Sequence, residues 1–210
     1  MDVISNSPVL WSSALPRPAP DAHKYNRGHA VILGADLYTG ATRLAAEACS
    51  RIGAGLVTVL SDEQSDIYRA TLPADIMVKA DAIEDINRPT TLLAGPGGCS
   101  DIQARQLIGA DPGLSIILDA DAIRLSPELA TRPCILTPHA AEFERYFETS
   151  AKQPAEQAPE AARVSEHVIV LKGPYTVIAA PDGRTALNTN ASPYLAKAGT
   201  GDVLAGLITG

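Results

Sequence analysis

One stretch of the chain, residues 29–60, predicts a complete β-α-β unit and so constrains the fold more than any other feature. Its first part, HAVILG at residues 29–34, is an apolar run of strand length, and LVTVL at residues 56–60 is another. Between them, residues 41–52 carry apolar side chains at helical spacing. The predicted buried stripe of this helix consists of Ala41, Leu44, Ala45, Ala48, Cys49 and Ile52. Two strands joined by such a helix are typical of a parallel sheet.

The rest of the chain continues this alternation of strands and helices. Further buried strands are predicted at residues 91–94, 116–119, 134–137 and 168–171, and helices near 101–110, 139–148 and 157–165. Residues 175–180 and 185–188 predict a hairpin, and the polar stretch 152–160 predicts a surface loop. We therefore predict a single α/β domain over residues 29–210, with a mostly parallel central sheet flanked by helices, after an irregular segment at residues 1–28.

The net charge and the cysteines limit which partners the protein can bind and in which compartment we expect it. The 210 residues carry a net charge of −7, which argues against binding to nucleic acid or to an anionic membrane surface. No apolar run in the sequence is long enough to cross a bilayer. Cys49, Cys99 and Cys134 are far apart and lack the spacing of a metal site. We therefore expect a cytoplasmic protein that binds neither nucleic acid nor membrane.

The chain ends in AGTGDVLAGLITG, where small residues come directly before a carboxylate and an apolar run. Gly199, Thr200 and Gly201 allow a tight turn that exposes backbone N–H groups. Asp202 then opens a predicted helix, and the positive end of a helix attracts an anion such as a phosphate. A carboxylate is unfavourable beside a phosphate unless it acts on a third group. From these residues alone, Asp202 is either a simple helix cap or a group with such a role.

Other unusual loops follow predicted strands directly. They contain Gly95-Pro96-Gly97-Gly98, Asp119-Ala120-Asp121, Thr137-Pro138-His139 and Lys172-Gly173. In open parallel sheets the carboxyl ends of the strands line the ligand crevice. These loops and the glycine turn at the chain end therefore predict one shared site. Each loop also has a plain structural interpretation, as a tight turn, a helix cap or a solvated lysine.

In this order, the motifs resemble those of one family. The matching pieces are HKYNRGHAVILG, YTGATRLAAEACSRIGAGLVTVL, GPGGCSD, ILDADAI, ILTPHAAEF, VIVLKGPYTVIAAPDGR and AGTGDVLAG. From Lys24 to Gly210 they resemble the ADP/ATP-dependent NAD(P)H-hydrate dehydratases, which have a ribokinase-like layered fold. The resemblance implies a lyase for the S epimer of hydrated NADH or NADPH (NADHX, NADPHX). Such an enzyme phosphorylates the ring hydroxyl with ADP or ATP, with Mg²⁺ on the nucleotide phosphates, and then eliminates phosphate.

The resemblance also implies roles for individual residues. Asp202 would be the catalytic base that accepts the proton of the substrate hydroxyl, while nearby N–H groups hold the transferred phosphoryl. The implied substrate-binding residues are Ala41, Gly97, Gly98, His139 and Asp202. The implied nucleotide-binding residues are Lys172, Gly173, Pro174, Tyr175, Thr176, Gly199, Thr200 and Gly201. Asp119 and Asp121 are candidates to organise Mg²⁺ through water, but loop capping explains them as well, so no metal ligand is assigned.

Two departures from the family pattern affect these expectations. The family motif GPGLG reads GPGGC here, so Cys99 is expected to narrow the site or to shift the turn. Family members continue with further helices beyond the position of Gly210, so we expect the C-terminal helices of the fold to be missing. The resemblance also implies homo-oligomers, and fusion or pairing with an epimerase that interconverts the two hydrates.

Two other functions stay open at this point. A small-molecule kinase of the same fold, acting on a vitamin-precursor alcohol, would share the GTGD turn. An inactive nucleotide-binding remnant would account for Cys99 and for the position of the chain end. The motifs YTGA, LDADA and TPH favour the dehydratase over the kinase.

Overall fold

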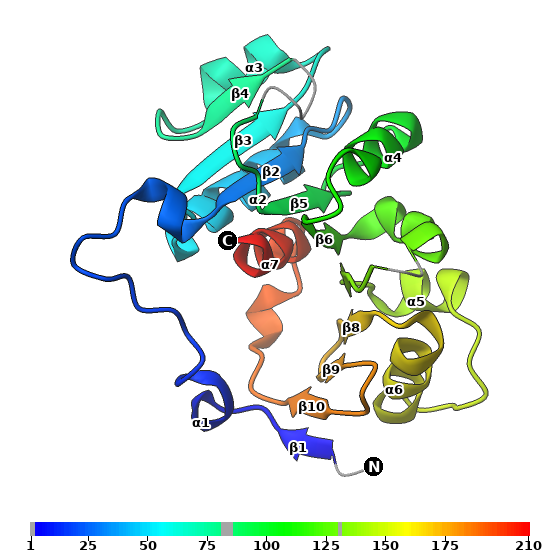
Figure 1. Cartoon of the computed structure of the whole chain (residues 1–210). Helices are drawn as coiled ribbons and strands as arrows, with labels where there is room; N and C mark the ends of the chain where they lie inside the picture. The colour runs from blue at the N-terminus through cyan, green and yellow to red at the C-terminus, as the bar shows by residue number, and fades with distance from the viewer. Residues whose placement is uncertain (1–2, 81–85, 130–131) are drawn as a thin grey trace. The chain divides into compact units, whose positions relative to one another are not determined.

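A computed structural model of the chain describes residues 3–80, 86–129 and 132–210. The chain forms two compact units: unit 1 consists of Met1–Arg17 and Ser126–Ala196, and unit 2 consists of Pro18–Leu125 and Lys197–Gly210. Figure 1 shows that both units combine helices with strands. Every described neighbouring pair of strands in unit 2 is parallel, and in unit 1 two of the four pairs are, so the predicted α/β class with a mostly parallel sheet is confirmed.

Unit 2 contains the predicted β-α-β unit in a parallel sheet. Its described strands are β2 (His29–Leu33), β3 (Leu56–Leu60), β4 (Met77–Lys79), β5 (Thr91–Ala94) and β6 (Ser115–Leu118). They lie in the order β6-β5-β2-β3-β4, and each neighbouring pair is parallel. All residues of the middle strand β2 are buried, as expected for an apolar run inside a parallel sheet. The sequence pattern does not predict β4, because its side chains are partly exposed and form no apolar run.

Two helices of unit 2 pack along each other on this sheet. The described helices are η1 (Lys24–Arg27), α2 (Thr39–Ile52), α3 (Ser65–Thr71), α4 (Asp101–Ala110), α7 (Thr200–Thr209) and η3 (Ala120–Leu129), which continues into unit 1. Helix α2 packs on β2 and β3, whereas α7 packs on β5 and β6 and contacts α2 (Figure 1). A Cβ at Gly206 would overlap the carbonyl oxygen of Ala45, so glycine permits the close approach of α7 to α2.

The predicted buried stripe of α2 is partly wrong. The buried residues of this helix are Thr42, Ala45, Ala46, Ala48 and Cys49. Leu44 and Ile52, expected in the stripe, are 41% and 55% exposed. Their side chains lie beside the two ends of α7, near Gly199 and Gly210 respectively. The backbones of α7 and α2 approach closely at Gly206 and Ala45, so small residues fill the centre of this contact. The larger side chains Leu44 and Ile52 lie at its two ends.

Unit 1 has a mixed sheet. Its described strands are β1 (Val3–Ser5), β7 (Ile135–Leu136), β8 (Val168–Leu171), β9 (Thr176–Ala179) and β10 (Thr185–Asn188). Their order is β1-β10-β9-β8-β7, with β9 antiparallel to both of its neighbours and the other pairs parallel. The predicted hairpin is therefore confirmed as β9 and β10, and a second short turn joins β8 to β9.

The surface loop predicted at residues 152–160 is wrong from Pro154 onward, because α6 begins there. The described helices of unit 1 are α1 (Pro8–Trp11), α5 (Ala140–Tyr146), α6 (Pro154–Ser165) and η4 (Pro193–Leu195). A proline suits the first helical position, where its missing N–H would have no helical partner. Pro159 lies inside α6 and is buried, as α6 packs on β8 and β9. Two prolines in a polar stretch therefore do not mark a loop here.

The N-terminal segment contains short elements in its described part. Residues 1–28, expected to be irregular, include β1 and α1 in unit 1 and η1 in unit 2, while residues 1–2 lie outside the described ranges. None of the helices in the described ranges combines the length and the apolar character needed to cross a membrane.

Candidate functional site

The start of α7 provides backbone donors with a carboxylate beside them. Gly199 precedes the helix with φ 93°, a left-handed conformation that glycine adopts without strain. A Cβ at this position would lie 2.6 Å from Cδ1 of Leu44, so the packing also favours glycine. Asp202 lies in the first turn of α7, where backbone N–H groups have no partner within the helix. One helical turn therefore offers both hydrogen-bond donors for an anion and an acceptor for a proton.

Gly97 and Ala41, both predicted to contact substrate, lie side by side in unit 2. Gly97 has φ 83°, and a Cβ built on it would be 3.1 Å from the Cβ of Ala41. It would also be 2.9 Å from the Cβ of Ala35 and would overlap the carbonyl oxygen of Tyr38. Gly98 has φ 101°, but a Cβ there would meet nothing within 4 Å. Glycine at position 97 is thus required by packing and backbone, and at position 98 by the backbone alone.

Helix α2 brings two of the predicted glycine turns together. Gly97 packs against Ala41, and Gly199 packs against Leu44, three residues further along the same helix. Residues three apart on a helix lie on one face. The turn after β5 and the turn before α7 therefore meet on the first part of α2.

Cys99 fits its turn without backbone strain. The non-glycine residues with positive φ in the described ranges are Arg88, Ala120 and Glu166, so position 99 accepts a side chain. Burial raises the pKa of the Cys99 thiol to about 11. The sulfur is therefore protonated at neutral pH and is a poor nucleophile.

A buried hydrogen-bond network holds these loops, and the sequence patterns do not reveal it. Thr42 Oγ1 accepts a hydrogen bond from the Ala35 N–H at 3.0 Å and donates one to the Pro96 carbonyl at 3.1 Å. The hydroxyl of Tyr68 donates to the Ala35 carbonyl at 2.6 Å. The side chains of Thr42 and Tyr68 are both fully buried. The loops after β2 and β5 are thereby tied to α2. In the sequence, the only indication of this network is Thr42 itself, a polar residue next to the predicted apolar positions of the helix.

Replacing Thr42 with valine is expected to lower the free energy of unfolding by about 2–3 kcal/mol, because a buried N–H and a buried carbonyl lose their partner. Urea denaturation measures this difference. Thr71 gives the matched control, since its hydroxyl donates to the Ile67 carbonyl on an exposed part of α3. The Thr71→Val change should cost less than about 0.5 kcal/mol. Equal losses for the two variants would contradict a role of Thr42 in holding the loops.

The two carboxylates after β6 differ in their surroundings. Asp119 is buried and Asp121 is exposed, and both take part in polar interactions. Ala120 between them has φ 48°, a strained conformation for a residue other than glycine. In the described ranges, no group of three or more His, Cys, Asp or Glu side chains is placed to hold a metal ion. Two carboxylates at this edge are fewer than a metal site built from protein ligands alone requires.

His139 caps helix α5 in unit 1, which is the structural role that the sequence offers beside substrate binding. Its backbone N–H donates to Glu142 Oε2 at 2.8 Å, and its Nδ1 accepts the Glu142 backbone N–H at 3.3 Å. With Nδ1 as acceptor, Nε2 carries the proton and lies 3.3 Å from Glu142 Oε1. The side chain is still 55% exposed, so a contact with substrate stays a prediction.

Lys172 is the neighbour of His139 in unit 1. The two residues form a parallel bridge, and the Lys172 N–H donates to the Pro138 carbonyl at 2.8 Å. Residues 173–175 make the exposed turn between β8 and β9, and the side chain of Tyr175 is largely in solvent. Unit 1 thus places His139 beside Lys172, the first of the predicted nucleotide-binding residues Lys172, Gly173, Pro174, Tyr175 and Thr176.

A family model for NAD(P)H-hydrate dehydratase matches residues 29–210, which include all the candidate residues described above. The chain belongs to the NAD(P)H-hydrate dehydratase family. The bifunctional NAD(P)H-hydrate repair enzyme Nnr of Methanopyrus kandleri is 36% identical over 218 residues, covering 96% of this chain and 43% of the relative. The ADP-dependent (S)-NAD(P)H-hydrate dehydratase of Bacillus subtilis is 35% identical, covering 94% of this chain and 77% of the relative. The chain therefore spans less than half the length of its bifunctional relatives.

Solved structures agree with the membership in the dehydratase family. A Bacillus subtilis ADP/ATP-dependent NAD(P)H-hydrate dehydratase, co-crystallized with ATP/Mg²⁺, matches with a TM-score of 0.78 and 31% identity over 100% of this chain and 81% of that one. A ribokinase-like superfamily protein from Enterococcus faecalis matches with a TM-score of 0.81 and 27% identity, over 99% of this chain and 78% of that one. The ribokinase-like fold predicted from the motifs is confirmed.

Proposed function

We propose that this member of the NAD(P)H-hydrate dehydratase family uses ADP or ATP to dehydrate the S epimer of NADHX and NADPHX, which restores NADH and NADPH. The observation that carries the proposal is the position of Asp202, in the first turn of α7 just after the left-handed Gly199. A proton acceptor there lies beside donors for a phosphoryl group. The family match over residues 29–210 supports the same activity.

The first step transfers a phosphoryl group to the hydrate. The ring hydroxyl oxygen attacks the terminal phosphorus of the nucleotide while the Asp202 carboxylate accepts the hydroxyl proton. The bond between that phosphorus and the bridging oxygen breaks, so AMP leaves when ADP is the donor and ADP leaves when ATP is. The N–H groups of Gly199, Thr200 and Gly201 stabilise the charge on the transferred oxygens.

The second step eliminates phosphate from the ring. The ring carbon–oxygen bond breaks, phosphate leaves with the electron pair, and the ring nitrogen supplies electron density to that carbon. The adjacent carbon then loses a proton, and the double bond returns. No electrons are exchanged with another molecule, so the reduced nicotinamide is restored without an oxidant or a reductant.

Each unit contributes residues that we assign to binding. In unit 2, Ala41, Gly97 and Gly98 would contact the hydrated dinucleotide at the turn after β5. In unit 1, the exposed ring of His139 would also contact this substrate. The turn with Lys172, Gly173, Pro174, Tyr175 and Thr176 would bind the adenine nucleotide, with Lys172 offering a positive charge to phosphate.

Mg²⁺ fits this chain as an ion carried on the nucleotide. The described residues offer the carboxylates of Asp119 and Asp121 at the end of β6 but no larger group of metal ligands. Magnesium is usually held by one or two carboxylates, several waters and substrate phosphates. Asp119 or Asp121 would orient such an ion through water, and the ion would reduce the negative charge of the phosphates.

Product analysis separates this proposal from a kinase of the same fold. The chain is incubated with hydrated NADH, Mg²⁺ and ADP or ATP, and the products are identified by mass spectrometry. The dehydratase predicts NADH and phosphate in equal amounts. A stable phosphorylated alcohol with no NADH would instead indicate a kinase, and nucleotide binding without any product would indicate an inactive remnant.

The relatives and the cysteines of this chain bear on its partners and its compartment. Because several relatives that match along this chain are named bifunctional, we propose that it acts together with an epimerase for the two hydrates. Cys49, Cys99 and Cys134 are free, in keeping with a reducing cytoplasm. Assembly into a homo-oligomer is also part of the proposal and can be measured by light scattering.

A further inference from the structure

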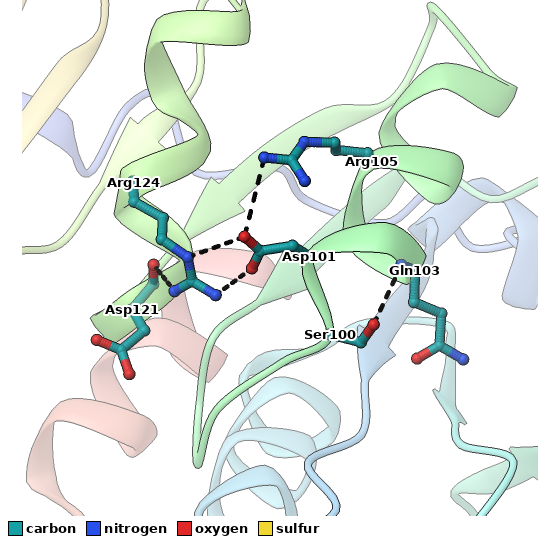
Figure 2. A network of polar contacts seen from close by, with 6 residues as sticks. All are labelled: Ser100, Asp101, Gln103, Arg105, Asp121 and Arg124. Carbon is teal, nitrogen blue, oxygen red and sulfur yellow. Dashed lines mark hydrogen bonds and ion pairs between the residues drawn. The ribbon is translucent and has the colours of Figure 1, made fainter.

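Arg124 connects two loops at the carboxyl edge of the sheet in unit 2 (Figure 2). Its guanidinium donates to both carboxylate oxygens of Asp101, with Nε 3.2 Å from Oδ2 and one terminal nitrogen on Oδ1. The other terminal nitrogen donates to the backbone carbonyl of Asp121. Asp101 begins α4 directly after the loop at residues 95–100, and Asp121 follows β6. Arg124 and Asp121 both lie in η3, so this side chain links the start of α4, and with it the loop after β5, to the first turn of η3 directly after β6.

The other end of the same loop rests on the same turn. Gly95 has φ 120° and lies so close to the carbonyl oxygen of Asp119 that a Cβ would overlap it. Ala120 follows with φ 48°, and a residue in this conformation persists only where its surroundings hold it. The turn after β6 is thus contacted by Gly95 on one side and, through the Asp121 carbonyl, by Arg124 on the other.

Gly97 lies between these two anchors. The loop closes through a hydrogen bond from the Gly98 N–H to the Gly95 carbonyl at 2.8 Å. Gly97 and Gly98 both have positive φ, and glycine has few backbone restraints of its own, so the path of the loop is set by the groups that hold it. The contact of Gly97 with Ala41 therefore depends on the hydrogen bond from Thr42 to Pro96 and on where the two ends of the loop are fixed.

We infer that Arg124 is a positioning residue that fixes the loop at residues 95–100, and with it Gly97, for binding of the hydrated dinucleotide. The identity of this ligand rests on the proposed function, whereas the anchoring of the loop does not. A bidentate arginine–carboxylate pair is stronger and more exact in geometry than a single ion pair. Beside Arg124, the pKa of the Asp101 carboxyl is lowered from its usual range, so the pair is ionised at neutral pH.

Arg105 provides a matched control for the charge at Asp101. Its terminal nitrogen lies 3.8 Å from Oδ2 of Asp101, four residues away on the same helix (Figure 2). The Arg105→Gln change removes a positive charge from this carboxylate but leaves the link between the two loops. The Arg124→Gln change removes the same charge and the link.

Steady-state kinetics separates positioning from plain loss of stability. We expect Arg124→Gln to raise the KM for hydrated NADH about tenfold or more, with the nucleotide KM and kcat changing less than about threefold. A variant that is only less stable lowers the amount of active enzyme and hence the maximal rate, but not KM. Arg105→Gln should leave all three constants unchanged. The double variant Asp101→Asn, Arg124→Gln should have the same KM for hydrated NADH as Arg124→Gln alone, because each change breaks the same Arg124–Asp101 pair.

Amide hydrogen exchange tests the anchor without any activity. Residues 97–101 of the free protein should exchange about tenfold faster in Arg124→Gln than in the wild type or in Arg105→Gln. If the wild type restores no NADH, the proposed function fails, and the exchange result still decides the inference. Unchanged exchange in Arg124→Gln, or an unchanged KM in an active enzyme, would overturn it.

Discussion

Replacing Asp202 with asparagine is expected to lower kcat for dehydration of hydrated NADH by about 10²–10⁴-fold, the usual contribution of a general base. Asparagine has the same shape and can take the place of Asp202 in the first turn of α7, but its amide cannot take the hydroxyl proton. The KM values should change little, because the asparagine amide can still hydrogen-bond to the substrate hydroxyl that Asp202 is expected to bind. Initial rates with ADP and with ATP at saturating hydrate give the comparison.

A second acidic residue of unit 2 gives the control for Asp202. Asp66 lies on the exposed face of helix α3 and pairs with Arg69 at 3.1 Å. Asp66→Asn should keep the wild-type kcat, because exposed ion pairs contribute little even to stability. If Asp202→Asn retained more than about a third of the wild-type kcat, Asp202 would be a helix cap and not the base.

Replacing Gly97 with alanine is expected to weaken binding of the hydrated dinucleotide at least about tenfold and to destabilise the protein by about 2–4 kcal/mol. The new methyl group would overlap the carbonyl oxygen of Tyr38 and press on Ala35 and Ala41. Relief of this overlap must move either the loop or the start of α2. Binding is measured with NADH, the reaction product, by fluorescence titration, and stability by urea denaturation.

Gly98→Ala is the matched control, because it introduces the same methyl group at a similar backbone angle. Both glycines have positive φ, but a Cβ at Gly98 meets nothing within 4 Å. We expect this variant to lose only about 1 kcal/mol of stability from the backbone term and to weaken NADH binding less than Gly97→Ala does, because the methyl group displaces no neighbouring atom of the protein. Equal binding defects in both variants would mean that packing against Ala41 does not matter for this site.

The strands of unit 2 could be predicted because their signal is local. The runs at β2, β3 and β5 are mostly apolar and are bounded by glycine or polar residues, so burial and length follow from the sequence. The error at α6 has a local cause as well, since Pro154 in a polar stretch favours a loop but here is the first residue of a helix. Leu44 was misplaced for a different reason, because its exposure depends on where α7 lies.

The site was predictable only where the backbone itself requires particular residues. The turn before Asp202 needs glycine for its left-handed conformation, and this requirement is visible in the sequence. The contacts of Thr42 and the link from Arg124 to Asp101 join residues from separate elements. No local pattern marks such pairs, because each side chain alone is compatible with an ordinary helix surface. They become visible only in the folded chain.

We propose that this chain restores the reduced nicotinamide from its hydrate at the expense of a nucleotide. The most direct measurement is the absorbance of reduced nicotinamide after hydrated NADH, Mg²⁺ and ADP or ATP are added to the folded protein. We expect the absorbance to return with at least one nucleotide, and to return only slowly with Asp202→Asn. A folded protein that binds the nucleotides yet gives no return with either of them would contradict the claim.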